Sequence, residues 1–232
     1  MQLTIIDSKH NCCGCLLAKG LTDEQCQQLS MVVHTKRRYQ RGEKVYRVAD
    51  AFKSVYLVQQ GSIKTEATTY DGRAVVTGFY FPGDIFGLDG LEGEGYLCDA
   101  VAIEDALVCE VPFKSLTKLC SSVEGIQDRL FMLLGQRIGS HDHTLIMMHN
   151  MSAESRLCRF LTIYHERMKK YLVNQGAVMI LPMNKDDIAR YLGISPETLS
   201  RMLTRLVDKG VIRKHARKLE LLDIDTLYEM AC

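Results

Sequence analysis

Three cysteines stand close together near the start of the chain, and their thiols are the groups with the most distinctive chemistry. Cys12, Cys13 and Cys15 are three of the nine cysteines among 232 residues. Iron–sulfur clusters are held by four thiolates, often with three of them close in sequence. Zinc can be bound by cysteines together with a histidine such as His10. The segment is therefore a candidate for an iron–sulfur cluster, with a zinc site, a thiol redox site or no cofactor as the alternatives.

A second set of polar side chains follows a strong helix start. Ser195 can cap a helix whose first residue is Pro196, and an apolar stripe then runs along it. Side chains off such a stripe can enter the major groove of DNA, where Arg bonds guanine and Glu accepts from cytosine. The candidate DNA contacts are Glu197, Thr198, Ser200, Arg201, Arg205 and Lys209. A small helical domain with a solvated charged face is the alternative.

The helix before Ser195 completes a helix-turn-helix pattern. Asn184 can cap it, and Gly193 suits the tight turn that ends it. The β-like runs 211–214 and 218–222 then suit a winged hairpin. Residues 184–218 hold nine Lys or Arg against four Asp or Glu, a net charge of +5 on a chain whose total is +1. This compact basic segment favours double-stranded DNA as the partner over a merely solvated face.

The elements that position these residues differ in texture along the chain. Residues 1–20 are polar and rich in cysteine. Residues 21–113 contain short β-type runs broken by glycines, which is typical of an antiparallel β-roll, and Thr22 can cap a helix before it. Residues 114–149 are predicted to be a long helix, and residues 150–232 a winged helix-turn-helix domain. The expected fold class is α+β.

The helix predicted over residues 114–149 carries an apolar stripe. Its members step by three and four positions, which is the spacing of helices that pair side by side. A helix lying against its own domain is the alternative. We expect a homodimer that binds a palindromic operator, with an interface formed by Phe131, Leu134, Ile138, His141, Leu145 and Met148.

Composition and motifs exclude several classes of protein. Apolar residues make up 47% and charged residues 25% of the chain, a balance that excludes a largely disordered protein. The sequence lacks the roughly 18 uninterrupted apolar residues of a membrane helix and a secretory signal, so we expect a cytoplasmic protein. It also lacks Walker, His-Glu-x-x-His and Gly-x-Ser-x-Gly motifs, so no enzyme activity is predicted. A redox or metal-binding protein whose C-terminal domain binds another protein is the competing class.

The order of roll, long helix and winged helix-turn-helix resembles the CRP/FNR family of transcription regulators, and most closely its oxygen-sensing FNR branch. Glu197-Thr-Leu-Ser200-Arg201 matches the Glu-x-x-Ser-Arg reading motif of that branch, and Pro82-Gly83-Asp84 resembles the glycine turn of the roll. Residues 106–112 are similar to the segment that carries the roll cysteine of FNR, which puts Cys109 at that ligand position. The resemblance implies TTGAT-like half-sites, oxygen sensing and RNA polymerase as a partner.

The cysteine pattern departs from that of the resembled branch. FNR-type sensors carry a Cys-x-x-Cys-x5-Cys run, whereas here Cys12 and Cys15 keep only its first spacing and the third place falls on Leu21. The resemblance implies a [4Fe–4S] cluster, whose expected ligands here are Cys12, Cys13, Cys15 and Cys109, with Cys26 as a further candidate that better suits the core. A regulator of the same fold with a thiol-redox, zinc or other signal is the alternative.

The resemblance also raises cAMP as a ligand, because the roll of CRP binds it. In CRP an Arg-Ser pair after the glycine turn holds the phosphate. The corresponding residues 96–100 contain no Arg and include the acidic Asp99. An anionic phosphate needs a cation or a helix N-terminus, so binding of cAMP is not expected.

Overall fold

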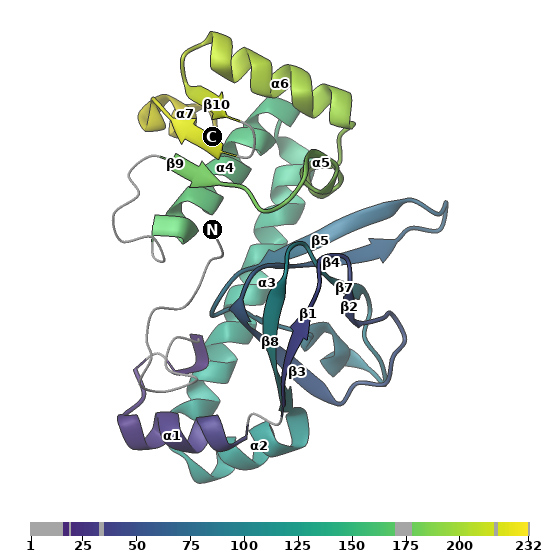
Figure 1. Cartoon of the computed structure of the whole chain (residues 1–232), viewed down its shortest axis with the longest axis vertical. Coiled ribbons are helices and arrows are strands. Elements are labelled where there is room, and N and C mark those ends of the chain that lie inside the picture. Colours follow the sequence, from purple (N-terminus) through teal and green to yellow (C-terminus); the bar gives the residue numbers. More distant parts are fainter. Residues whose placement is uncertain (1–15, 19, 33–34, 170–177, 216–217, 232) are drawn as a thin grey trace. The chain divides into compact units, whose positions relative to one another are not determined.

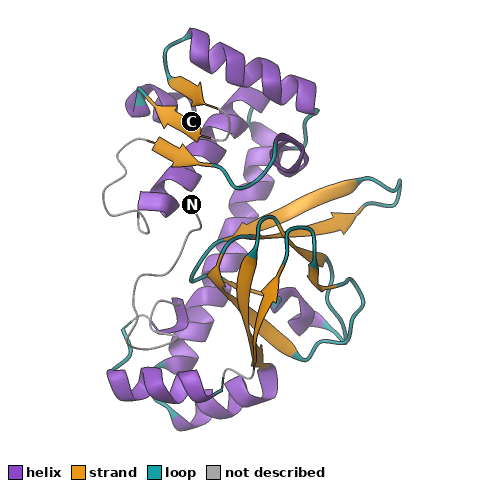
Figure 2. Ribbon diagram, viewed as in Figure 1, coloured by secondary structure: helices purple, strands orange, loops and turns teal. Residues whose placement is uncertain are grey.

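Short strands joined by glycine turns build most of the first unit of the chain. The computed structural model describes residues 16–18, 20–32, 35–169, 178–215 and 218–231, and it divides the chain into the units Met1–Ser140 and His141–Cys232. Figure 1 identifies the elements by label, and Figure 2 distinguishes helices from strands. The expected α+β class, with an antiparallel roll and a winged helix-turn-helix, is confirmed.

The roll consists, in the part of the chain that the structure describes, of two antiparallel sheets of four strands each. Their strand orders are β1-β8-β3-β6 and β2-β7-β4-β5. One core of buried residues lies between them and takes side chains from both. The strands are β1 (Thr35–Tyr39), β2 (Lys44–Tyr46), β3 (Ser54–Gln60), β4 (Ile63–Thr68), β5 (Ala74–Tyr80), β6 (Ile85–Phe86), β7 (Asp99–Ala102) and β8 (Ala106–Pro112).

One glycine of the roll is required by a close approach of the backbone. Gly61 joins β3 to β4 with a φ of +75°, a region that L side chains rarely adopt. A Cβ atom at this position would lie 2.4 Å from the carbonyl oxygen of Asp105. Only glycine therefore fits this turn, which explains why a glycine separates these two strand runs.

Strand β1 lies at the edge of its sheet and is unusually polar. It pairs with β8 on one side only, and Tyr39 is its buried residue. Lys36, Arg37 and Arg38 are exposed. The guanidinium of Arg37 lies 4.9 Å from the centre of the Tyr39 ring. This edge of the roll is therefore lined with positive charge.

A second core of the first unit lies on the other face of the β1-β8-β3-β6 sheet. It is formed by helices packed against β3 and β8: η1 (Leu16–Ala18), α1 (Asp23–Met31), α2 (Phe113–Ser122) and the start of α3 (Ile126–Asn150). Thr22 caps α1 through the expected capping box with Gln25. Neighbouring residues of β8 face the two cores in turn, with Val108 in the roll and Cys109 among the helices.

The segment predicted as one helix over residues 114–149 is two helices. α2 ends at Ser122, and Val123 has extended backbone angles. Gly125 then has a φ of +85°, which an α-helix does not allow, so the chain turns before α3 begins. α3 has 25 residues. None of the helices that the structure describes, α3 included, is long and apolar enough to cross a membrane.

The second unit is a winged helix-turn-helix. In its described residues a three-stranded sheet of order β10-β11-β9 accompanies the helices. Strand β9 was not expected from the sequence, whereas both wing strands were. The elements are α4 (Ala153–Lys169), β9 (Val178–Ile180), α5 (Lys185–Leu192), α6 (Pro196–Asp208), β10 (Ile212–His215), β11 (Lys218–Leu221) and α7 (Ile224–Met230).

Candidate functional site

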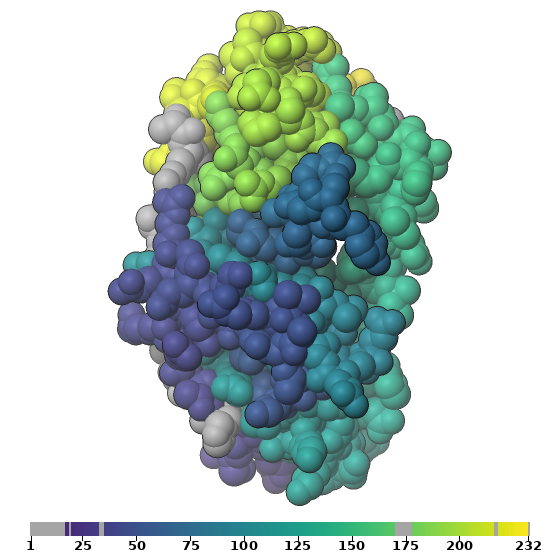
Figure 3. Space-filling view, turned by 90° about the vertical axis from the view of Figure 1, so that its right-hand side faces the viewer, coloured from purple at the N-terminus to yellow at the C-terminus, as the bar shows by residue number. Residues whose placement is uncertain are grey.

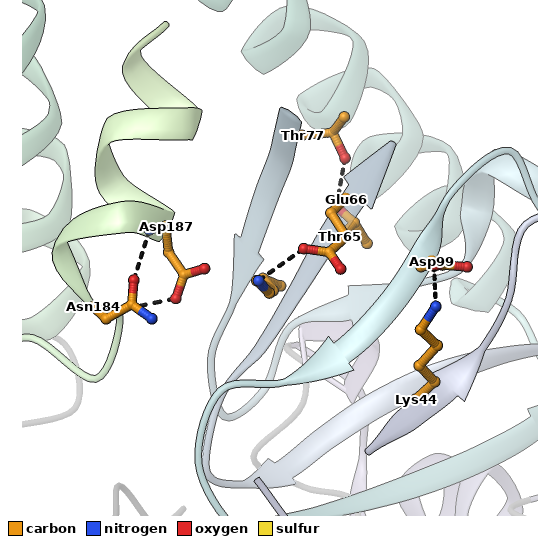
Figure 4. A network of polar contacts seen from close by, with 8 residues as sticks. Lys44, Thr65, Glu66, Thr77, Asp99, Asn184 and Asp187 are labelled. Atoms are coloured by element: carbon orange, nitrogen blue, oxygen red, sulfur yellow. Dashed lines mark hydrogen bonds and ion pairs between the residues drawn. The ribbon is translucent and has the colours of Figure 1, made fainter. Parts of the chain in front are cut away.

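Local hydrogen bonds fix the turn that presents α6. The side chain of Asn184 accepts from the backbone N–H of Asp187 at 2.7 Å, and the Asp187 carboxylate accepts in return from the N–H of Asn184 at 3.4 Å (Figure 4). Gly193 ends α5 in the left-handed region with a φ of +65°. The hydroxyl of Ser195 accepts from the N–H of Thr198 at 3.1 Å. These residues are the caps and the turn that the sequence predicts.

The apolar stripe of α6 is buried and its opposite face is exposed. Leu199 and Leu206 are fully buried, and Met202 and Leu203 nearly so. In the space-filling view the side chains of α6 (yellow-green, top) reach the surface (Figure 3). Of the predicted DNA contacts, Thr198 and Ser200 are partly buried, and the exposed ones are Glu197, Arg201, Arg205 and Lys209. The helix thus combines a packed face with a polar face that is free to contact a partner.

The charged residues of this face differ in their partners. The pKa of Glu197 is lowered by its own backbone N–H, then by the Ser195 hydroxyl, with the nearby Arg201 adding to the effect. Glu197 is therefore a carboxylate held at the helix N-terminus. Lys209 forms an ion pair with Glu154 of α4 at 2.9 Å. A phosphate contact by Lys209 would have to share that ammonium group with Glu154.

Lys185 is a residue that the sequence pattern does not single out. It is the first residue of α5, and its ammonium group donates to the Ser200 hydroxyl of α6 at 3.2 Å. Lys214 of β10 lies beside it. Positive charge within residues 184–218 is visible in the sequence, but the meeting of three separate elements is not.

Cys109 is the predicted cluster ligand that the structure describes. It is fully buried in β8, and its thiol lies 3.6 Å from the side-chain oxygen of Gln59. Leu17 and Ala18 belong to the same core as Cys109. These two residues follow Cys15 by two and three positions, so the end of the cysteine-rich segment lies on the same face of the sheet as Cys109. Cys12, Cys13 and Cys15 themselves lie outside the described residues.

The other described cysteines are buried or half-buried, without the surroundings of a reactive thiol. Cys26 packs in the helical core, as expected. Burial, then Asp89, raises the pKa of Cys98 to about 12, and burial, then Glu154, raises the pKa of Cys158 to about 11. Burial also raises the pKa of Cys120. Within residues 16–18, 20–32, 35–169, 178–215 and 218–231, no group of three or more His, Cys, Asp or Glu is arranged to hold a metal ion.

The interior of the roll packs aromatic rings beside a carboxylate that the roll's own donors contact. Tyr46 and Tyr96 stack with ring centres 3.9 Å apart, and both are buried. The Asp89 carboxylate accepts from the backbone N–H of Leu97 at 2.9 Å, from the Cys98 thiol at 3.3 Å and from the Tyr46 hydroxyl at 3.3 Å. The donors after the glycine turn therefore already serve an internal anion. The absence of cAMP binding stays a prediction.

The predicted dimer stripe of α3 is largely exposed in the single chain. Phe131, Ile138 and Leu145 are 58%, 64% and 58% exposed, and His141 is exposed as well. Leu134 instead packs partly against the helical core. Met148 is also half-buried, and its sulfur lies 3.7 Å from the Arg156 guanidinium. Part of the stripe is therefore apolar and exposed, whereas Leu134 and Met148 also make contacts within their own units.

Two family models match the two units. The model described as a Crp-like helix-turn-helix domain matches residues 155–230. The model described as a cyclic nucleotide-binding domain matches residues 36–123. The first covers α6 and the wing, and the second covers the roll with Cys109.

Relatives resemble nearly the whole chain. The transcriptional regulatory protein btr of Bordetella pertussis is 30% identical over 229 residues, covering 97% of this chain and 94% of the relative. The transcriptional activator protein anr of Pseudomonas aeruginosa is 30% identical, covering 95% and 92%. Among solved structures, FixK2 from Bradyrhizobium japonicum is 28% identical with a TM-score of 0.78, covering 85% of this chain and 97% of FixK2. The relatives are transcription regulators rather than enzymes.

Proposed function

Because the chain belongs to the CRP/FNR family of DNA-binding transcription regulators, in its FNR branch, we propose that it is a homodimeric regulator that senses oxygen or redox state. The observation that carries the DNA-binding part is the α6 helix, whose buried stripe leaves Glu197 and Arg201 exposed at its start. It binds a palindromic operator in double-stranded DNA. It acts in the cytoplasm, with RNA polymerase as its partner in transcription.

Arg201 and Glu197 read one G·C base pair of a TTGAT-like half-site. Arg donates two hydrogen bonds to the O6 and N7 atoms of guanine, and Glu accepts from N4 of cytosine. The ionised state of Glu197, favoured by the helix N-terminus, suits this role. Thr198 and Ser200 add contacts to base edges or phosphate, and Arg205 contacts phosphate.

Two copies of the chain pair through the outward apolar part of α3. Phe131, Ile138 and Leu145 are exposed and repeat at helical spacing. Side chains of this kind gain stability when two helices bury them against each other. A two-fold dimer then presents two α6 helices, which matches a palindromic operator.

The signal acts through Cys109 and the cysteine-rich segment. A [4Fe–4S] cluster would be held by Cys12, Cys15, Cys109 and, as the fourth ligand, Cys13, and it supplies an oxygen-labile link between these thiols. Two observations fit it: the Cys109 thiol is buried on the helical face of the sheet, and Leu17 and Ala18 pack on that same face. β8 ends at Pro112 and α2 begins at the next residue. A cluster bound to Cys109 would therefore be attached four residues before α2, the helix that leads to α3.

The experiment is iron and sulfide analysis of protein purified without oxygen, with DNA binding measured before and after exposure to air. The expected result is about four iron atoms per chain, operator binding that is lost in air, and loss of both iron and air response in Cys109→Ala. Cys98→Ala is the matched control. Cys98 is also a buried thiol of the roll, but its thiol donates a hydrogen bond to the Asp89 carboxylate and is not among the expected ligands. Iron-free protein with unchanged DNA binding in air would exclude the cluster.

A regulator of the same fold with a different signal is the second candidate. The observation that favours it is Leu21, which stands where the third cysteine of the FNR run is expected. Leu21 packs against the helical core, so no thiol is available at that place. Zinc or thiol oxidation at Cys12, Cys13 and Cys15 would then provide the signal. Zinc in the metal analysis, or an air response that a thiol reductant reverses in iron-free protein, would identify this alternative.

A further inference from the structure

Three side chains from separate elements meet beside the exposed face of α6. Lys185 begins α5, Ser200 lies in the second turn of α6, and Lys214 is in wing strand β10. The Lys185 ammonium donates to the Ser200 hydroxyl at 3.2 Å, and Lys214 lies next to Lys185. Both lysines are exposed, and Ser200 is partly buried. Ser200 therefore connects this cluster to Arg201, its neighbour in the chain.

Lys185 and Lys214 differ from Lys209 and Arg213 in forming no ion pair with a carboxylate among the described residues. Lys209 is paired with Glu154 and Arg213 with Glu220, each at 2.9 Å. Across the described residues, no ion pair is found for Lys185 or Lys214. Burial, and then the neighbouring Lys185, lowers the pKa of Lys214. Two adjacent ammonium groups repel each other, and a bound anion would relieve that repulsion.

The hydrogen-bonding capacity of the cluster suits an anion with several oxygens. An ammonium group has three N–H donors, and Lys185 uses one of them on Ser200. Because the Ser200 oxygen accepts from Lys185, its own O–H remains to donate elsewhere. The cluster thus offers donors from both lysines and from the serine. The two non-bridging oxygens of a phosphodiester are acceptors of that kind.

We propose that Lys185, Ser200 and Lys214 form one binding site for a single phosphodiester group of the DNA backbone. The proposal rests on the proposed function, since it adds a backbone anchor to the same DNA-binding face. The anchor carries no sequence information, because every nucleotide offers the same phosphate. Its effect is to fix the register of α6, so that Arg201 meets its base pair.

The test measures affinity for duplexes over a range of salt concentrations. Wild type, Lys185→Gln, Lys214→Gln and the double variant are compared on a palindrome with two TTGAT half-sites and on one with a base pair changed in each half. Losing one phosphate contact lowers the slope of log affinity against log salt by about 0.9 per half-site. Lys169→Gln is the matched control, because it removes the same charge from a lysine that pairs with Glu166 in α4.

Each single variant should show a reduced slope of log affinity against log salt. In the double variant this slope should fall by about 0.9 per half-site rather than by twice that amount, because the two lysines share one phosphate. Affinity should fall by the same factor on both duplexes, and the control should keep the wild-type slope. Any of three results would overturn the shared site. These are an unchanged slope in the double variant, a fall in its slope of about 1.8 per half-site, and a loss of affinity on one duplex only. Wild type without preference between the duplexes would instead contradict the proposed function.

Discussion

The two units hold their chemically important side chains in opposite ways. In the second unit Glu197, Arg201 and Arg205 are exposed on a helix whose other face is buried. In the first unit Cys109 is fully buried, and Cys98 bonds the Asp89 carboxylate inside the roll. The second unit presents these side chains at its surface, whereas the first encloses both thiols in its interior. Variants that separate surface effects from interior effects test this contrast.

The largest effect is expected from the exposed apolar part of α3. Ile138→Glu places two like charges in the proposed dimer seam, so the chain should become monomeric. Affinity for a palindromic operator should then fall by about 10²–10⁴, because the second half-site no longer binds intramolecularly. Sedimentation velocity and DNA binding check this result. Gln136→Glu adds the same charge at an exposed position off the stripe and should leave the dimer intact.

The next effect concerns base reading on α6. Arg201→Ala should cost about 1–3 kcal/mol of discrimination at one base pair, since the two bonds to guanine are lost. Folding should be unaffected because Arg201 is exposed. Arg205→Ala should weaken matched and mismatched operators by similar factors. Equal loss on both operators for Arg201→Ala would show that this residue contacts backbone rather than a base.

A smaller effect is expected in the turn that presents α6. Gly193 has a φ of +65°, and a Cβ atom there would have ordinary contact distance, 3.7 Å, to the sulfur of Met148. The cost of Gly193→Ala is therefore conformational, about 1–2 kcal/mol of unfolding free energy. Gly193→Asn should cost less, because asparagine tolerates the left-handed region. Equal losses for both variants in denaturant unfolding would point to a steric cause instead.

The smallest effect comes from a buried histidine of the second unit. His165 is 3% exposed, and burial, then Lys169, lowers its pKa. Its neutral form is favoured in the folded state, so its contribution to stability is complete above the unfolded pKa of about 6.5. That contribution falls as the pH drops toward the lower folded pKa, by at most about 1.4 kcal/mol per pH unit. The difference in unfolding free energy between wild type and His165→Phe should follow this course. A difference that is constant from pH 7 to pH 5 would contradict it.

The second unit was largely predictable because its signals are local. The caps at Asn184 and Ser195 need only the three residues that follow them, and Gly193 needs only its own conformation. The buried face of α6 follows from helical spacing alone. Strand β9 was not predicted because its three residues, Val178–Ile180, are too few to show an alternation of apolar and polar residues.

The first unit was less predictable because its important contacts join distant parts of the chain. Cys109 shares a core with Leu17 and Ala18 only because helices pack against a sheet whose strands come from different places in the sequence. The same holds for Asp89 meeting Tyr46, and for Lys185 meeting Ser200 in the second unit. The turn at Gly125 was missed although the weak helix formers Ser121, Ser122 and Val123 precede it, because the segments on both sides were predicted as one helix.

The charged strand β1 has a consequence for the behaviour of the protein at high concentration. Its free edge exposes backbone groups to which a strand of another molecule could add, the first step toward aggregation. A second copy aligned there would bring its own Lys36, Arg37 and Arg38 against the same residues, and like charges in register repel. Edge-to-edge pairing at β1 is thereby disfavoured, so self-association is directed away from this strand.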